Sequence, residues 1–166
     1  MSANITYDPF GYAHDTKPPT NGKTFEDAFG PILLDHPNVA IRWRLGEGLR
    51  IRNIHGRTVS VPAFKTPADW GGVLKDGRAF LIECKWASKA RAMGARVRQH
   101  QRDALIISAM SGASSWLVIG FGDRQQVWAV HGSALANTSN SLTLKEVEEH
   151  GTLIGTPTDF SVARLF

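Results

Sequence analysis

The sequence predicts an α/β or α+β domain with a mixed central β-sheet flanked by helices. The main observation is the order of patterns along the chain: a helical pattern, a group of strand patterns, a second helix and further strands. The composition agrees, because 42% of the 166 residues are hydrophobic and 20% are charged, which suits a packed core. This length predicts a single domain, expected over residues 23–166.

The first third of the chain is predicted from turn residues and periodicity. Residues 1–22 are typical of a flexible arm, since Pro-Pro and Asn-Gly pairs interrupt them. A helix is predicted over residues 23–35, with acids in its first turn and a weak point at Pro31. Alternating apolar residues then predict a three-stranded meander over residues 39–61, with arginines on one face.

A β-hairpin is predicted next. Its strands cover residues 69–74 and 79–85, and the Asp76-Gly77 pair between them is a strong signal for a hairpin turn. The remaining predicted elements are a helix over 93–110 with an apolar face of Val97, Leu105, Ile106 and Met110, strands over 115–121 and 125–131, and a short acidic helix over 144–150.

The sequence also bears on where the protein works. No apolar run approaches the roughly 20 residues that a membrane span requires, so no membrane contact is expected. The N-terminus lacks the basic and apolar regions of a secretory signal. One cysteine cannot form an intrachain disulfide, which favours a reducing compartment. A cytoplasmic location is therefore expected.

Positive charge is concentrated in the middle of the chain. Residues 42–102 hold 14 Lys and Arg against four acids, whereas the rest of the chain holds 5 against 11. A basic segment of this kind favours a polyanionic partner, most often nucleic acid. The alternative is a solvated surface with unevenly spread charge.

Three charged residues of the hairpin can be brought together by strand pairing. Asp69 lies at the start of the first strand, and Glu83 and Lys85 lie at the end of the second. Residues two apart on a strand share a face, so Glu83 and Lys85 point the same way and Cys84 is expected to pack on the opposite side. Two carboxylates on neighbouring strands can hold Mg²⁺, and a lysine beside it can position water and offset phosphoryl charge. The pattern predicts a metal-dependent nuclease site, although Glu-x-Lys alone is also typical of an exposed salt bridge.

This arrangement resembles the PD-(D/E)xK nuclease superfamily and, within it, the RecU-type Holliday junction resolvases. The resemblance rests on four motifs in the same order and rough spacing over residues 22–150. They are Glu26-Asp27 on the first helix, Asp69-Trp70-Gly71-Gly72-Val73, Glu83-Cys84-Lys85 at the end of an apolar strand, and His100-Gln101 on the next helix. The chain departs from the family at Pro67-Ala68, where threonines precede the acid, and in a shorter segment at residues 39–66. Archaeal-type resolvases of the same superfamily are a near alternative.

The resemblance implies a restriction-endonuclease-like fold and an endonuclease that resolves four-way DNA junctions by paired symmetric nicks. It implies a homodimer with Mg²⁺ as cofactor, for which Mn²⁺ is expected to substitute. Asp69, Glu83 and Gln101 would hold or orient the metal. Lys85 would stabilise the transition state, and Glu26 would reach the same cleft from the first helix. The alternatives are another repair or restriction-like nuclease of the superfamily and a non-catalytic DNA-binding module of the same fold.

Basic residues in two places are predicted to contact DNA. Arg50 and Arg52 alternate with apolar residues in a protruding hairpin at about 46–62, in the place of the stalk that RecU proteins push into the junction centre. His100 is as typical of a surface helix residue as of a DNA contact. Near the second helix, phosphate contacts are expected from Lys89, Arg91, Arg96 and Arg98.

Overall fold

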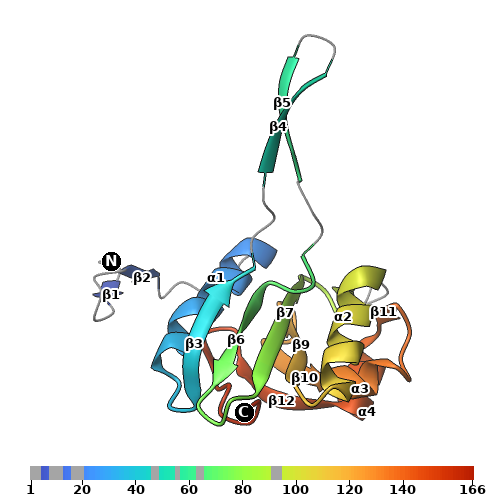
Figure 1. Ribbon diagram of the computed structural model, residues 1–166. Coiled ribbons are helices and arrows are strands. Elements are labelled where there is room, and N and C mark those ends of the chain that lie inside the picture. The colour runs from blue at the N-terminus through green and yellow to red at the C-terminus, as the bar shows by residue number, and fades with distance from the viewer. Residues whose placement is uncertain are drawn as a thin grey trace.

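A seven-stranded mixed β-sheet with helices on both faces forms the body of the protein (Figure 1). The computed structural model describes residues 5–7, 13–15, 21–45, 49–54, 57–62, 66–90 and 95–166. The strands of the sheet, in the order in which they pair, are β13 (Asp159–Phe160), β12 (Gly151–Thr156), β10 (Gln126–His131), β9 (Ser114–Phe121), β7 (Ala79–Ala87), β6 (Trp70–Leu74) and β3 (Val39–Arg44). Neighbouring strands are antiparallel except β7 and β9, which run parallel. The predicted mixed sheet with flanking helices is confirmed.

The remaining elements are helices and short strand pairs. The helices are α1 (Gly22–Asp35), α2 (Gln99–Met110), α3 (Gly132–Leu135) and α4 (Leu144–His150). Further antiparallel pairs are β1 (Ile5–Tyr7) with β2 (Ala13–Asp15), β4 (Leu49–Ile54) with β5 (Arg57–Pro62), and β8 (Ala95–Arg96) with β11 (Ser141–Leu142). Among the described residues, no helix is both long enough and apolar enough to cross a membrane.

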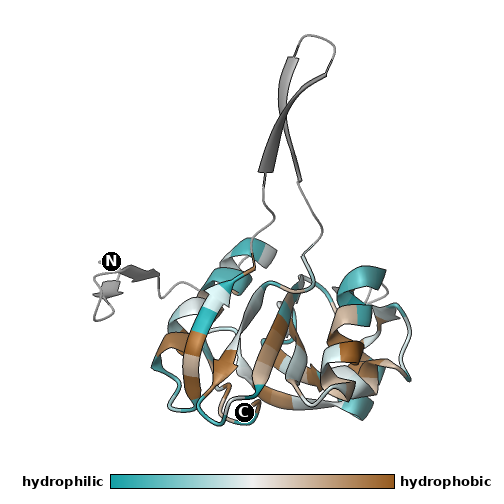
Figure 2. Cartoon of the chain, in the orientation of Figure 1, coloured by the Kyte–Doolittle hydropathy of each residue, from teal (hydrophilic) through white to brown (hydrophobic). Residues whose placement is uncertain are grey.

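The sheet separates two hydrophobic cores, because successive residues of a strand face opposite sides. On β7, Phe80, Ile82 and Cys84 pack in the core that contains the buried phenylalanines of α1. Leu81 and Ala87 belong to the opposite core, which α2, α3 and α4 cover. Figure 2 shows hydrophobic residues concentrated along the strands of the main sheet. Each helix layer is therefore held to the sheet by apolar burial.

Helix α1 begins one residue before its predicted range and continues through Pro31 to the predicted end. Its cap is Asn21, whose side chain accepts from the Thr24 N–H at 3.0 Å, while Thr24 Oγ1 accepts from the Asn21 N–H at 3.2 Å. Pro31 does not end the helix, because burial of its apolar face outweighs one lost hydrogen bond. The prediction of acids in the first turn is wrong, since Glu26 and Asp27 lie one turn further along.

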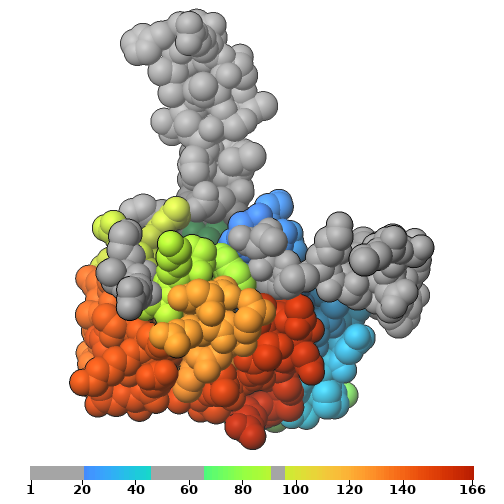
Figure 3. Space-filling view, turned by 180° about the vertical axis from the view of Figure 1, so that it is seen from behind, coloured from blue at the N-terminus to red at the C-terminus, as the bar shows by residue number. Residues whose placement is uncertain are grey.

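The C-terminal segment completes the core beneath α1. The ring of Phe160 lies 5.9 Å from that of Phe25 and 4.9 Å from that of Phe29, between centroids. The Leu165 carbonyl accepts a hydrogen bond of 2.8 Å from Trp116 Nε1. Seen from behind, the red C-terminal residues lie next to the blue and cyan residues of α1 and β3 (Figure 3). The sequence patterns did not predict β12 and β13, the strands that lead into this segment.

The predicted meander over residues 39–61 is wrong in its first pairing, whereas the expected pairing of its second and third strands is confirmed. Strand β3 pairs with β6 at the edge of the main sheet, and β4 and β5 pair with each other as a separate two-stranded sheet (Figure 1). Glycine permits the pairing of β3 with β6, since a Cβ at Gly72 would lie 2.1 Å from the Ile41 carbonyl oxygen and 2.3 Å from the Phe80 ring. Periodicity predicts that a segment is a strand, but it does not identify the partner.

Helix α2 also differs from its prediction. It begins at Gln99 instead of residue 93, because Ala95–Arg96 form β8. Met110, expected on the apolar face, is 79% exposed. The buried residues of the helix are Gln101, Arg102 and Leu105. Polar side chains replace apolar ones on the inner face because they find hydrogen-bond partners there.

The predicted strands and the helix of the C-terminal third are confirmed. The strands expected over 115–121 and 125–131 are β9 and β10, each within one residue, and the helix over 144–150 is α4. Helix α3 and the β8–β11 pair were not predicted. In the expected arm at 1–22, the described residues are the β1–β2 pair and the start of α1, and the rest of the arm lies outside the described ranges.

Candidate active site

The β6–β7 hairpin brings the predicted acids together. Trp70 pairs with Ile82, and the Asp69 N–H donates to the Ile82 carbonyl at 3.1 Å. Asp69 therefore lies beside the end of β7, where its Oδ2 accepts a hydrogen bond of 2.8 Å from the Cys84 N–H. In the closing turn, Gly77 has a φ of +87°, a conformation that favours glycine. The expected meeting of the acid with the end of the second strand is confirmed.

Glu83 and Lys85 lie on one face of β7, as their spacing predicts. The Lys85 ammonium forms an ion pair with Glu83 Oε1 and lies 3.4 Å from Oε1 of Gln101, which reaches it from α2. Glu83 is fully buried and Gln101 is 5% exposed. The second carboxylate oxygen, Glu83 Oε2, is buried without a hydrogen-bond partner among the described residues. Because such an atom is costly to bury, a cation or water bound there would stabilise the site.

Cys84 faces the opposite side of β7 and packs in the core next to α1. Burial raises the pKa of its thiol well above the usual range, and the charges of Asp69 and Glu83 act in the same direction. A buried thiol that stays protonated is a packing group and not a nucleophile. The expectation that Cys84 belongs to the core is confirmed.

Burial dominates the electrostatics of the two acids. It raises the pKa of Glu83 to about 8; the charge of Asp69 adds to this effect, and Lys85 opposes it. Burial also raises the pKa of Asp69, against the hydrogen bond from the Cys84 N–H, which lowers it. The charge of Glu26 raises both values further. Acids that resist ionisation for these reasons would be stabilised in the ionised form by a bound cation.

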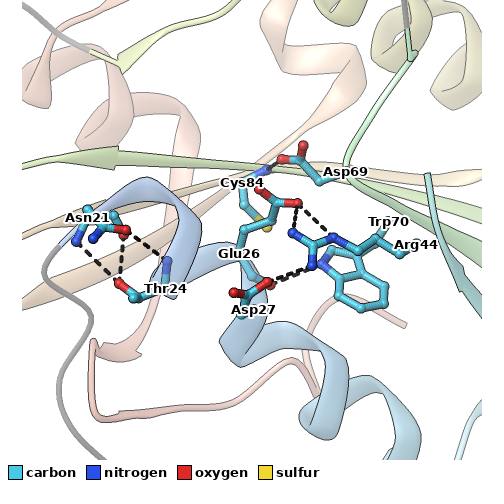
Figure 4. A network of polar contacts seen from close by, with 8 residues as sticks. All are labelled: Asn21, Thr24, Glu26, Asp27, Arg44, Asp69, Trp70 and Cys84. Atoms are coloured by element: carbon cyan, nitrogen blue, oxygen red, sulfur yellow. Dashed lines mark hydrogen bonds and ion pairs between the residues drawn. The ribbon is translucent and has the colours of Figure 1, made fainter. Parts of the chain in front are cut away.

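Arg44, at the end of β3, holds Glu26 of α1 beside the site (Figure 4). Its Nε donates to Glu26 Oε1 at 3.0 Å, its Nη2 contacts the same oxygen, and its Nη1 donates to Asp27 Oδ1 at 2.6 Å. The guanidinium carbon lies 5.7 Å from the ring centre of Trp70, whose Nε1 donates to the Glu26 carbonyl at 3.1 Å. Burial opposes the charge of Arg44, but Glu26 and Asp27 outweigh it and raise the pKa of the guanidinium. Arg44 therefore fixes α1 to the end of β3, which pairs with β6 next to Asp69.

The donor atoms of the site suit a hard cation. Among the described residues, no group of three or more His, Cys, Asp or Glu side chains could hold a metal ion. The donors that the hairpin and α2 bring together are the carboxylates of Asp69 and Glu83 and the amide oxygen of Gln101. Mg²⁺ is commonly held by one or two carboxylates, with waters and substrate phosphate completing its shell. The set is smaller than a structural Zn²⁺ site requires.

The predicted DNA-binding residues fall in two groups. Those described with exposed side chains are Lys89, Arg96 and Arg98, which lie between β7 and α2. Within the described part of the chain, neither Lys89 nor Arg96 forms an ion pair. Residue Arg91 lies outside the described ranges. Strand β4 carries the other group, Arg50 and Arg52, whose backbones pair with β5 and whose side chains are not among those described.

Sequence reasoning missed the roles of Arg44 and Arg102. Arg102 belongs to the basic segment, yet it is 6% exposed and its guanidinium donates to the carbonyls of Thr138 at 2.6 Å and Ser139 at 3.0 Å. It anchors the loop after α3, and its buried side chain is not available to contact a ligand at the surface. The adjacent acids Glu26 and Asp27 indicate that a cationic side chain lies nearby. The sequence does not identify that side chain, because residues 42–102 contain 14 Lys and Arg.

Compared with models of known protein families and with curated protein sequences, the chain matches none. Its function is therefore argued from the site itself. That site combines a buried acid and a partly buried acid, a lysine ion-paired with the buried one, and a third acid held by an arginine. Such a set can bind a divalent cation and stabilise charge on a phosphoryl group.

Proposed function

We propose that the chain is a Mg²⁺-dependent endonuclease with a restriction-endonuclease-like PD-(D/E)xK fold, which resolves four-way DNA junctions as a homodimer by paired nicks. The observation that carries the proposal is a fully buried acid, Glu83, close to a partly buried acid, Asp69, with Lys85 in contact with the buried one. Asp69 accepts a hydrogen bond from the Cys84 N–H, one residue from Glu83, and Lys85 is ion-paired with Glu83 on the same face of β7. The mixed sheet with a helix layer on each face is compatible with this fold.

The residues present fit a Mg²⁺ ion. Glu83 Oε2 is buried without a partner among the described residues, and burial raises the pKa of both Glu83 and Asp69. These two carboxylates would hold the ion, and Gln101 would complete or orient its shell. When bound, Mg²⁺ polarises a phosphoryl oxygen and neutralises charge that develops during hydrolysis. Mn²⁺ is expected to substitute, because it accepts the same oxygen ligands.

Lys85 supplies a positive charge in addition to that of the metal ion. Its contacts with Glu83 and Gln101 hold the ammonium at the edge of the acid pair, and 23% of its side chain remains exposed. A phosphate in contact with that exposed end would share the ammonium charge, and a water there would be oriented for attack. Glu26, fixed by Arg44, supplies a third carboxylate on the α1 side that can orient water.

The proposed substrate is branched DNA because basic residues flank the acids. Lys89 and Arg96 are exposed between β7 and α2, the elements that carry Lys85 and Gln101. They would contact backbone phosphates. The chain enters the β4–β5 ribbon next to the site, since the Leu45 N–H donates to the Asp69 carbonyl at 2.8 Å. Arginines carried by that ribbon would meet the phosphates at the open centre of a junction, which a linear duplex lacks.

The test compares a four-way junction with a linear duplex of the same sequence in MgCl₂. We expect paired nicks in the junction, none in EDTA, and a loss of cleavage greater than about tenfold in Asp69→Asn and Glu83→Gln. Junction binding should persist in both variants, since the acids hold metal and not DNA. Glu149→Gln is the matched control, because Glu149 is exposed on α4 away from the acids. Cleavage should be unchanged in it.

Three outcomes separate the proposal from its alternatives. Equal cutting of junction and duplex would favour another repair or restriction-like nuclease. Binding without cutting would favour a non-catalytic DNA-binding module. Retention of more than about a tenth of wild-type cleavage by both acid variants would exclude Asp69 and Glu83 as the metal-holding pair.

A further inference from the structure

The acid cluster contains more carboxylates than one divalent cation needs. Its carboxylates belong to Glu26, Asp27, Asp69 and Glu83. Among the described residues, two side-chain cations are in contact with them, Arg44 on the α1 side and Lys85 on the β7 side. With every acid ionised, two negative charges remain, which one divalent cation balances. A second divalent cation would leave excess positive charge in a partly buried site, which is unfavourable.

The Arg44 guanidinium lies between the carboxylates of Glu26 and Asp27. Glu26 Oε1 and Asp27 Oδ1 both contact its guanidinium, so carboxylate oxygens from neighbouring residues converge on one group. The Trp70 ring lies against the same guanidinium, and the Trp70 indole N–H is tied to the Glu26 carbonyl. Figure 4 shows Arg44, Glu26 and Trp70 beside Asp69, whose carboxylate is bonded to the Cys84 amide. Each guanidinium nitrogen therefore contacts a carboxylate, and the ring restricts its movement.

We infer that Arg44 is a positioning residue that takes the place of a second metal ion, so that the site binds a single divalent cation at Asp69 and Glu83. The inference rests on the proposed function, because it takes those two acids as the ligands. Glu26 is then an acid held in place by the protein and not a metal ligand. Removal of the guanidinium would leave convergent oxygens of Glu26 and Asp27 and open a second cation site.

The experiment counts bound Mn²⁺ on the full chain without DNA, by calorimetry and by the electron paramagnetic resonance of free Mn²⁺. Wild type should bind one Mn²⁺ per chain, and Arg44→Gln should bind a second, weaker one. Arg44→Lys keeps the charge, so its count should stay at one. Glu26→Gln added to Arg44→Gln should return the count to one. The matched control is Arg78→Gln, which breaks an exposed Arg78–Asp76 pair in the hairpin turn and should leave the count at one.

The outcomes distinguish this inference from the proposed function. Two Mn²⁺ in wild type, or one in Arg44→Gln, would overturn the role of Arg44 and leave the nuclease proposal intact. No bound Mn²⁺ in wild type would overturn both. Circular dichroism checks that each variant is folded. If Arg44→Gln does not fold, Glu26→Gln alone decides: an unchanged count and affinity support the inference, and a loss of affinity beyond about tenfold overturns it.

Discussion

Replacing Glu83 by Gln should change how the stability of the metal-free protein depends on pH. Glu83 is fully buried, and burial together with the charge of Asp69 raises its pKa to about 8 from an ordinary value of 4.5. The folded protein therefore keeps a proton on Glu83 that the unfolded chain has released. Between these two pH values the folded state binds more protons than the unfolded state, so stability falls as pH rises. This contribution is fully present below about pH 4.5 and is lost as pH rises through about 8.

The magnitude follows from the two pKa values. Each pKa unit corresponds to about 1.4 kcal/mol, so the full effect between pH 4.5 and 8 is on the order of 5 kcal/mol. Near neutral pH, Glu83 should lower the free energy of unfolding by about 1 kcal/mol for each unit of pH. The Gln variant does not titrate and lacks this contribution. Asp69, whose pKa burial also raises, leaves the variant with a residual slope of the same sign.

The assay is urea unfolding in EDTA at pH 5.5, 6.5 and 7.5 for wild type and Glu83→Gln. Groups common to both proteins cancel in the comparison of slopes, as does any pH-independent cost of changing the contact between residue 83 and Lys85. We expect the variant to have the shallower slope and to gain stability relative to wild type as pH rises. Mg²⁺ should stabilise wild type more at pH 7.5 than at pH 5.5. Parallel slopes in EDTA would refute the reasoning that a buried, protonated Glu83 governs this behaviour.

Three other perturbations test separate parts of the molecule. Lys89→Ala with Arg96→Ala should reduce the slope of log affinity against log salt for DNA by about one to two, because each exposed cation would contact a phosphate; an unchanged slope in filter binding would move the DNA face elsewhere. Arg50→Ala with Arg52→Ala should weaken junction binding much more than duplex binding, since only a junction has an open centre; equal losses in paired binding assays would contradict the ribbon's role. Thr143→Ala removes the capping box of α4 and should lower the free energy of unfolding by roughly 0.5–2 kcal/mol; no change in urea unfolding would show that the cap is dispensable.

The hairpin and the nearness of its acids could be predicted from local sequence patterns alone. An Asp-Gly turn joins two apolar strands, and this local signal brings Asp69 to the end of β7. The i, i+2 spacing then orients Glu83 and Lys85 to one face and Cys84 to the other. These features were predictable because each depends on neighbours within one supersecondary unit.

The distant groups that complete the site could not be predicted in this way, because their contacts depend on how the whole chain packs. Arg44 reaches Glu26 across 18 residues, and Trp70 reaches the same residue across 44. The pairing of β3 with β6 requires a residue without a side chain at position 72. In the sequence pattern alone, a glycine at this position counts against a strand. Arg102 faces inward because carbonyls 36 and 37 residues away accept its hydrogen bonds. In each case the contact is selected by burial, steric fit and hydrogen-bond satisfaction across the whole fold, and no local propensity encodes these conditions.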